Sequence, residues 1–290
     1  MKDFIINPLA GGKDGKKMKK NLALIKARLD QVKEEYRFHF TERARHATKI
    51  TEELIANGAT DVIVVGGDGT LHEVVNGFSQ FNKVALGIIP CGTGNDFASA
   101  LNIPKNPVDA LNLILNSTPK FTDFMQMPNV RGINVIGMGI DVDVLKRYEM
   151  LKKKTKFGYT KCLIKTLFDF EYTDFSVETE KSAKDYRSFL VVVANGNRFG
   201  GGIPVCPVAS ATDNKLDFLT VTEMKKIKII NAFIKLKQGK VLSIKQANHE
   251  KTSFVKVTCP TPYTVNVDGE LYENIPFEIK VVSNQLRVYQ

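Results

Sequence analysis

The sequence predicts an α/β domain with a parallel sheet, followed by a second, mostly antiparallel β domain. In the first 122 residues, strand-like and helix-like segments alternate, and from about residue 123 strand-like segments dominate. The 290 residues suffice for one large domain or two modest ones. No segment rich in Pro, Gly or Ser separates the halves, so we place a soft boundary between residues 122 and 123.

The first domain has short apolar or alternating runs that predict strands at residues 4–6, 36–40, 62–65 and 84–89. Apolar residues at helical spacing predict helices at residues 19–33, 47–56, 71–78 and 107–115. Ligands of such sheets bind at the carboxyl ends of the strands. The loops after residues 6, 40, 65 and 89 are therefore the candidate binding loops.

The second domain is predicted from apolar runs separated by turn signals. The expected strands are residues 134–136, 176–178, 189–194, 216–221, 253–258, 263–267 and 277–282. Helical segments are expected at about residues 142–148, 158–168 and 226–237.

The composition is that of an ordinary globular protein, with 43% apolar and 25% charged residues. No apolar run approaches the ~18 residues that span a bilayer, and the first residues lack the apolar core of a signal peptide. We therefore expect a soluble, cytoplasmic protein. Cys91, Cys162, Cys206 and Cys259 are scattered without a C-x-x-C pair, which favours small buried hydrophobes over a disulfide frame or a zinc site. The histidines form no metal-spaced cluster either.

The net charge is +10, and the lysines cluster at residues 13–20, 152–156 and 225–245. Such clusters are usually solvated surface. Where they have a function, they bind nucleic acid, an anionic membrane or a phosphate-rich ligand. Residues 225–245 also carry Ile227, Ile230, Phe233 and Ile234 at helical spacing, which is more typical of core packing than of membrane contact.

The most informative loop follows the strand at residues 62–65 and runs through Gly66, Gly67, Asp68 and Gly69 into a helix. Glycines let the backbone approach phosphates, and helix N-termini favour anions. The T-x-x-E spacing of Thr70 and Glu73 predicts a capping box that fixes the helix start. Asp68 is placed to meet Mg²⁺ or a sugar hydroxyl. A tight turn would need one glycine, so three glycines around an acid favour nucleotide binding.

Other loops at this edge repeat the pattern. Residues 90–97 contain Gly92, Thr93, Gly94, Asn95 and Asp96 before a short helix. The loop at residues 7–13 and Thr41, at the end of the second strand, belong to the same edge. Neither the P-loop pattern nor G-x-G-x-x-G occurs, so the loops match neither standard fingerprint.

Residues 66–70 with Glu73 and Val74 resemble the signature of the diacylglycerol kinase catalytic-domain family. Its superfamily also holds sphingosine kinases, NAD kinases and, more remotely, phosphofructokinases. Residues 90–97 resemble the second motif of the bacterial branch, residues 7–11 its first loop, and residues 267–270 its D-G-E motif. The resemblance is specific because these motifs occur in order from residue 7 to about residue 270.

The resemblance implies a nucleotide domain, a β-sandwich domain and an active site in the cleft between them. The last strand, near residues 284–290, is expected to return to the first domain, so that the second comprises residues 123–283. ATP would be the phosphate donor, with Mg²⁺ bridging its phosphates. The implied nucleotide-binding residues are Asn7, Pro8, Leu9, Ala10, Gly11, Thr41, Gly66, Gly67, Asp68, Gly69, Thr70, Leu71, His72, Glu73, Gly92, Thr93, Gly94 and Asn95.

The resemblance assigns Glu270 as the general base that takes the proton of a lipid hydroxyl, while Asp268 and Asp96 position Mg²⁺ or the substrate. Alone, the D-G-E segment would be an exposed hairpin turn. The resemblance also implies a structural Mg²⁺ bound by the carbonyls of Ser210 and Lys215 and the carboxylate of Asp213. Asn214 stands where glycine is usual, although asparagine tolerates the left-handed conformation. A plain hairpin turn is an equally good interpretation of this segment.

We therefore expect an ATP-dependent kinase of diacylglycerol or a related lipid, peripherally associated with the inner face of an anionic membrane. Phosphatidylglycerol, ceramide, a sphingoid base and NAD stay open as acceptors, and a non-catalytic nucleotide- or lipid-binding sensor is the alternative class. We expect no nucleic-acid partner, since no nucleic-acid-binding motif accompanies the high pI. The oligomeric state stays open, a homodimer included.

Overall fold

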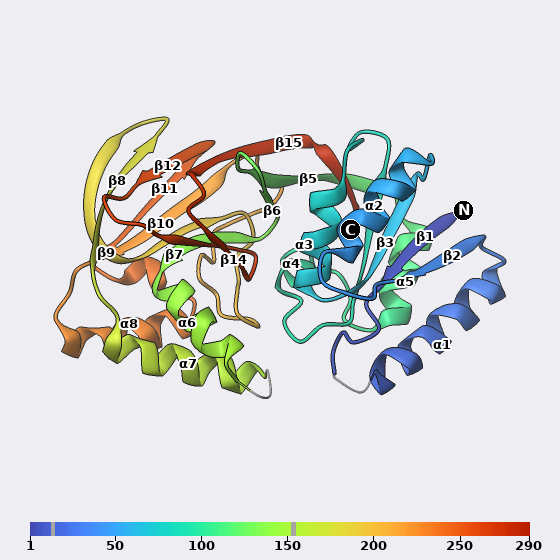
Figure 1. The fold of residues 1–290 in the computed structure, drawn as a ribbon, viewed down its shortest axis with the longest axis horizontal. Helices are drawn as coiled ribbons and strands as arrows, with labels where there is room; N and C mark the ends of the chain where they lie inside the picture. The colour runs from blue at the N-terminus through green and yellow to red at the C-terminus, as the bar shows by residue number, and fades with distance from the viewer. Residues whose placement is uncertain (13–14, 152–154) are drawn as a thin grey trace. The chain divides into compact units, whose positions relative to one another are not determined.

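The computed structural model describes residues 1–12, 15–151 and 155–290. Its contacts divide the chain into unit 1, Met1–Thr122 with Ser283–Gln290, and unit 2, Asp123–Val282. Figure 1 traces both along the chain. From the predicted lysine clusters, positions 13 and 152–154 lie outside the described residues, as do the side chains at positions 156, 226 and 227.

Unit 1 is built on a parallel sheet with the strand order β2–β1–β3–β4–β15. Its central strands are continuous apolar runs that are buried on both faces, as is typical of parallel sheets. The end of the chain completes the sheet, because Arg287 and Val288 pair with Ala85 and Leu86. The strands are β1 (Lys2–Ile6), β2 (Tyr36–Phe40), β3 (Asp61–Gly66), β4 (Ala85–Pro90) and β15 (Phe277–Tyr289).

The helices of unit 1 pack as two pairs, α1 with α5 and α2 with α3, which lie on opposite sides of the sheet (Figure 1). Each pair buries its apolar stripe against the strands, which is what places the loops at the sheet edge. The helices are α1 (Lys16–Val32), α2 (His46–Ala56), α3 (Asp68–Gly77), α4 (Asp96–Ala100) and α5 (Pro107–Asn116).

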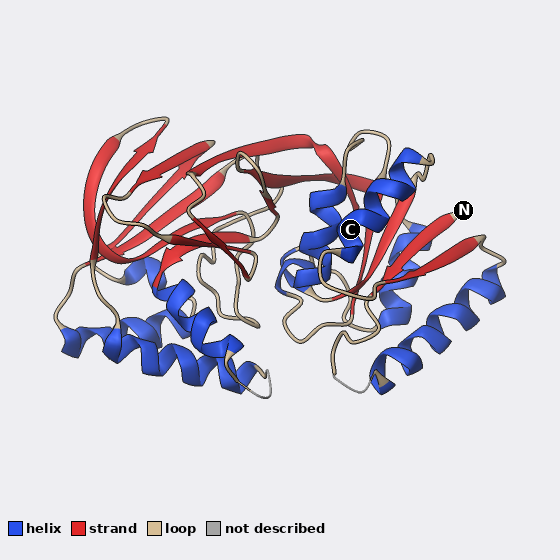
Figure 2. Ribbon diagram, in the orientation of Figure 1, coloured by secondary structure: helices blue, strands red, loops and turns tan. Residues whose placement is uncertain are grey.

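Unit 2 is formed by antiparallel strands with helices on one side (Figure 2). The long strand β9 pairs with β7, β8 and β10, and β12 joins β8 to β15. The strands are β5 (Pro119–Gln126), β6 (Arg131–Gly132), β7 (Val135–Gly139), β8 (Thr173–Thr179), β9 (Ala183–Ala194), β10 (Leu216–Thr222), β11 (Ala247–Thr252), β12 (Phe254–Thr258), β13 (Thr264–Val267) and β14 (Glu270–Glu273). The helices are α6 (Ile140–Glu149), α7 (Lys156–Asp169), α8 (Lys226–Lys237) and the short 3₁₀ helix η1 (Val241–Ser243).

Two hydrophobic cores lie on the two faces of the β9 region. Alternate residues of the strand divide between them: Val192 and Ala194 pack in the core under the helices, and Val191 and Val193 pack in the core between strands. This alternation is the period of two of a strand that is covered on both faces. The predicted fold class, a parallel α/β domain followed by a β-sandwich-like domain, is confirmed.

The sequence missed the strands β5, β6, β11 and β14 and placed the starts of α1 and α3 three residues too late. The missed β5 and β11 are rich in polar residues and lack a clear alternation, and their backbone pairing with neighbouring strands makes them strands. Helix α3 begins at Asp68 instead of residue 71. All four cysteines are free, and Cys91, Cys162 and Cys206 are buried, as expected of small hydrophobes. Within the described ranges, no helix has the length and apolar character needed to cross a membrane.

Candidate functional site

The predicted binding loops of unit 1 lie at one edge of the parallel sheet. The pairing register aligns Ile6 with Phe40 and Val65, and Gly66 with Pro90, so the loops that follow β1, β2, β3 and β4 leave the sheet at the same level. A small pocket at the ends of β3 and β4 is lined by Gly66, Gly67, Asp68 and Asn95 among other residues. The sheet therefore assembles these loops as the sequence predicts.

Asp68 joins two of the glycine-rich loops. Its carboxylate accepts hydrogen bonds from the backbone N–H groups of Asn95 at 2.7 Å and Asp96 at 2.8 Å, at the start of α4. Burial, followed by the nearby Asp96 carboxylate, raises the pKa of Asp68 to about 6, against the opposing effect of these N–H groups. Asp68 thus holds the loops together, a contact that the sequence did not predict.

The glycines are required by close backbone approach. A Cβ atom on Gly92 would lie 2.4 Å from the Gly67 Cα atom, and one on Gly67 would lie 2.9 Å from the Gly92 Cα atom. Gly11 has a φ of 78°, and a Cβ atom there would lie 2.5 Å from the Cys91 carbonyl oxygen. The loops after β1, β3 and β4 are therefore packed backbone against backbone.

Hydrogen bonds fix the first loop against α3. Asn7 donates from Nδ2 to the Thr70 hydroxyl at 3.1 Å, and its Oδ1 accepts the N–H of Leu9 at 3.0 Å. The backbone N–H of Thr41 donates to the Ile6 carbonyl at 2.9 Å. Leu9 and Thr93 are exposed, whereas Leu71 and His72 are buried in the packing of α3.

The predicted capping box is wrong. The N-cap of α3 is Gly67, and Thr70 lies inside the helix. The Glu73 carboxylate reaches the neighbouring helix α2, where it accepts the N–H groups of Arg45 at 2.9 Å and Ala47 at 3.0 Å. These N–H groups at the start of α2 have no helical partner of their own, which explains why a carboxylate is bound there.

We expect Glu73→Ala to lower the free energy of unfolding by about 0.5–2 kcal/mol, the usual cost of losing an N-cap. Urea denaturation measures the change. Glu52→Ala is the matched control, because Glu52 is exposed on α2, and it should leave the stability nearly unchanged. Equal effects of the two substitutions would contradict the assigned role of Glu73.

In unit 2, Glu270 lies in a two-residue hairpin between β13 and β14, where it pairs with Val267. Asp268 and Gly269 have φ values of 54° and 101°, as a type I′ turn requires. The Asp268 carboxylate accepts three backbone N–H groups, those of Ile133 at 2.7 Å, Asn134 at 2.8 Å and Val135 at 3.0 Å. Asp268 therefore anchors the turn to the segment before β7, and Glu270 is exposed at its end.

A buried carboxyl group is linked to the same turn. Asp141, at the start of α6, accepts a hydrogen bond from Asn266 Nδ2 at 3.0 Å, and Asn266 Oδ1 accepts the N–H of Gly269 at 2.8 Å. The other Asp141 oxygen has no hydrogen-bond partner within the part of the chain that the structure describes. Burial raises the pKa of Asp141 to about 7. This link could not be predicted from local sequence, because its members are distant along the chain.

Asp141 lines an apolar pocket between the helices and the sheet of unit 2. The cavity is small, with a volume of about 40 Å³. Tyr159, Leu163 and Phe233 represent its apolar lining from α7 and α8. Asp141 is the charged residue among the described residues that line it. The lining suits an apolar group, and Asp141 and the Tyr159 hydroxyl are polar groups within it.

The raised pKa of Asp141 predicts a pH-dependent stability. The neutral acid is favoured in the folded chain, so this stabilisation is complete below about pH 4 and is lost as the pH rises through about 7. We expect Asp141→Asn to gain stability relative to the wild type with rising pH, by about 1.4 kcal/mol per unit at most over this window. Urea denaturation of both proteins across the window measures the difference, and parallel curves would contradict the prediction.

The Asp213 carboxylate, expected as a ligand of a structural Mg²⁺, is paired with side-chain and backbone groups of the protein. Asn214 adopts the left-handed conformation with a φ of 60°, so the turn is compatible with asparagine. The Asp213 carboxylate, however, accepts the N–H of Lys215 at 3.2 Å and forms an ion pair with the ammonium group of Lys251. The Ser210 hydroxyl lies 3.2 Å from the Thr212 hydroxyl. The cation beside Asp213 is thus a side chain of the protein itself.

Comparison with known proteins agrees with this architecture. The family model for the diacylglycerol kinase catalytic domain matches residues 3–127, and that for the YegS C-terminal NAD kinase beta sandwich-like domain matches residues 134–290. The chain is 29% identical to the diacylglycerol kinase of Bacillus subtilis over 281 residues, covering 95% of this chain and 91% of the relative.

A YegS-like protein of Alcanivorax borkumensis, named as a probable lipid kinase, is 30% identical over 261 residues, covering 84% of this chain and 83% of that protein. The crystal structure of a candidate diacylglycerol kinase from Bacillus anthracis superposes with a TM-score of 0.81 at 25% identity and covers 99% of this chain and 96% of that one. The chain therefore belongs to the diacylglycerol kinase/YegS lipid kinase family.

Proposed function

We propose that the protein transfers the γ-phosphate of ATP to the hydroxyl of diacylglycerol, forming phosphatidate. The observation that carries the lipid assignment is the apolar pocket of unit 2, where the Asp141 carboxyl group is hydrogen-bonded through Asn266 to the turn that bears Glu270. A polar acceptor such as NAD would gain little from this lining, whereas an acyl chain would be desolvated there.

The edge of the unit 1 sheet supports ATP as the donor. Close backbone packing at Gly11, Gly67 and Gly92 holds the loops after β1, β3 and β4 together beside the N-terminus of α3, which favours anions. When bound with the nucleotide, Mg²⁺ neutralises charge on the transferring phosphate. Asp68 and Asp96 are the carboxylates of these loops that are suited to it, and the Asp68 pKa of about 6 leaves that group largely ionised at neutral pH.

Glu270 is the proposed general base. It would take the proton of the lipid hydroxyl as the oxygen attacks the γ-phosphorus. The type I′ turn and the three N–H bonds to Asp268 fix the backbone that carries Glu270. We therefore propose that Asp268 and Asn266 position the base at the exposed end of the hairpin.

The outer faces of α7 and α8 support a membrane-bound acceptor. Phe157, Ile164 and Phe168 on α7, and Ile230 and Ile234 on α8, are exposed large hydrophobics, and Phe157 has 79% of its surface exposed. Exposed lysines, Lys161 and Lys165 among them, lie on the same helices. Apolar side chains with lysines suit an anionic bilayer, where each lysine contributes about 1 kcal/mol. The lipid would then enter the pocket from the helices that contact the membrane.

The test is incubation of the pure protein with Mg²⁺, labelled ATP and mixed micelles of dioleoylglycerol. Labelled phosphatidate is the expected product. If ATP binds but no phosphatidate forms, diacylglycerol is excluded as acceptor. Phosphatidylglycerol, ceramide and sphingosine in the same micelles, and NAD in solution, then identify the acceptor. Failure with every lipid alongside phosphorylation of NAD would overturn the proposal.

A further inference from the structure

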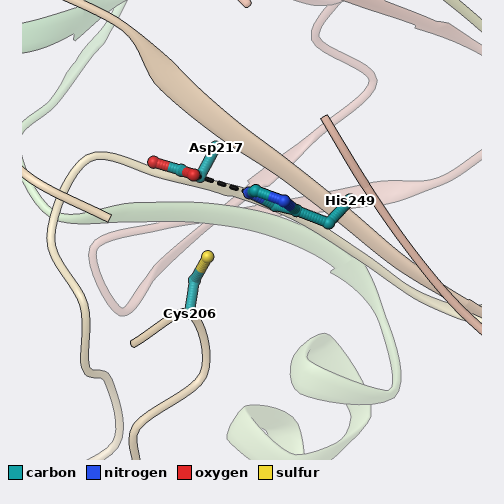
Figure 3. A group of neighbouring side chains, drawn as sticks. All are labelled: Cys206, Asp217 and His249. Carbon is teal, nitrogen blue, oxygen red and sulfur yellow. Dashed lines mark hydrogen bonds and ion pairs between the residues drawn. The ribbon is translucent and has the colours of Figure 1, made fainter. Parts of the chain in front are cut away.

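A buried cysteine, a buried aspartate and an exposed histidine converge in unit 2, away from the Glu270 turn in the sequence. One ligand atom from each of Cys206, Asp217 and His249 lies within 4.8 Å of the other two. Figure 3 shows the Cys206 sulfur directed toward the Asp217–His249 pair. Sequence spacing gave no sign of this group, because it is assembled from one loop and two strands.

The antiparallel pairing of β10 and β11 creates the group. Asp217 pairs with Lys251 and Leu219 pairs with His249, so Asp217 and His249 are diagonal neighbours on one face of the sheet. The loop that carries Cys206 lies over this face, and the backbone N–H groups of Val208 and Ala209 lower the pKa of its thiol against the larger effect of burial. Such N–H groups stabilise a thiolate, the form of cysteine that binds metals.

The charge of Asp217 is incompletely satisfied. The residue is fully buried, and its Oδ1 lies 2.6 Å from His249 Nε2. Its Oδ2 is buried and has no hydrogen-bond partner among the described residues, and the Lys251 ammonium is 3.8 Å away. A buried carboxylate oxygen without a hydrogen bond is costly unless a cation compensates it. The oxygen is therefore available to a positive ligand.

A nucleophilic role for Cys206 is disfavoured. The residue has no exposed surface, and burial, followed by the charge of Asp217, raises the pKa of the metal-free thiol to about 12. An acyl or phosphoryl acceptor could not reach a sulfur in this position. The His249 side chain, in contrast, is 24% exposed, which leaves a path for a small ion.

We propose that Cys206, Asp217 and His249 bind one divalent transition-metal ion of the zinc class. Sulfur, imidazole nitrogen and carboxylate oxygen are the ligands that Zn²⁺ takes, and three protein ligands leave a fourth position for water. A bound ion would join the loop of Cys206 to β10 and β11. This inference is independent of the proposed kinase reaction, because it requires neither ATP nor lipid.

Lys251 is the internal competitor for this position. Its ammonium group pairs with Asp213 and lies 3.8 Å from Asp217, and its side chain is 39% exposed. A divalent ion would repel the ammonium group toward solvent. We therefore expect Lys251→Gln to bind Zn²⁺ more tightly than the wild type.

The test is titration of the protein with Zn²⁺ and with Co²⁺ in excess Mg²⁺. The expected result is one tight equivalent per chain, with a thiolate-to-cobalt charge-transfer band. Cys206→Ser should lose the band and the tight equivalent, and His249→Gln should lose the equivalent even if Cys206→Ser misfolds. Cys259→Ser is the control and should keep both, because Cys259 lies outside the group. No tight equivalent in the wild type, or retention in all variants, would overturn the proposal.

Discussion

Glu270→Gln is expected to lower kcat for phosphoryl transfer by about 10²–10⁴-fold, the range that a general base contributes. Glutamine keeps the size of the side chain and removes its capacity to take a proton. Because Glu270 is exposed at a hairpin end, folding and ATP binding should be unchanged. Steady-state kinetics with dioleoylglycerol micelles measure the effect, and equilibrium nucleotide binding shows that the variant is intact.

Glu273→Gln is the matched control for this experiment. Glu273 is an exposed glutamate at the other end of the same short strand, β14. Its substitution changes the net charge by the same amount and should leave kcat near the wild-type value. If both variants lose activity equally, the effect is one of charge on the hairpin, and Glu270 is not the base.

Gly92→Ala is expected to lower kcat/KM for ATP by about 10²-fold, the scale of loss when reacting groups are displaced by 1 Å. The added Cβ atom would lie 2.4 Å from the Gly67 Cα atom, which belongs to the backbone and cannot rotate away. The loops after β3 and β4 must therefore separate. Nucleotide titration followed by kinetics at saturating lipid measures the change.

Gly58→Ala controls for the general cost of replacing a glycine. Gly58 follows α2 with a φ of 84°, and a Cβ atom there meets nothing within 4 Å. Alanine is strained at this φ, so the variant should be less stable, but its ATP binding should be that of the wild type. If Gly92→Ala has normal ATP kinetics, contact between the loops after β3 and β4 is not required for use of ATP.

Local sequence determined the elements that depend on neighbouring residues. Buried apolar runs such as Asp61–Gly66 predicted parallel strands, and the glycines after them predicted loops at the carboxyl edge of the sheet. The D-G pair at Asp268 and Gly269 predicted the hairpin for the same reason, since its turn geometry is set within a few residues. The folded protein contains these strands and this turn because the interactions that form them are local.

Only the tertiary structure decided the partners of the polar side chains. Glu73 was predicted to cap its own helix and instead caps α2, because packing of α2 against α3 brings unpaired N–H groups to it. Strand pairing likewise joins Asp141 to Asn266, and Cys206 to His249 through the face of β10 and β11. A hydrogen bond or metal ligand acts over a few ångströms in space, so residues far apart in the sequence become partners only when the sheet and its helices are assembled.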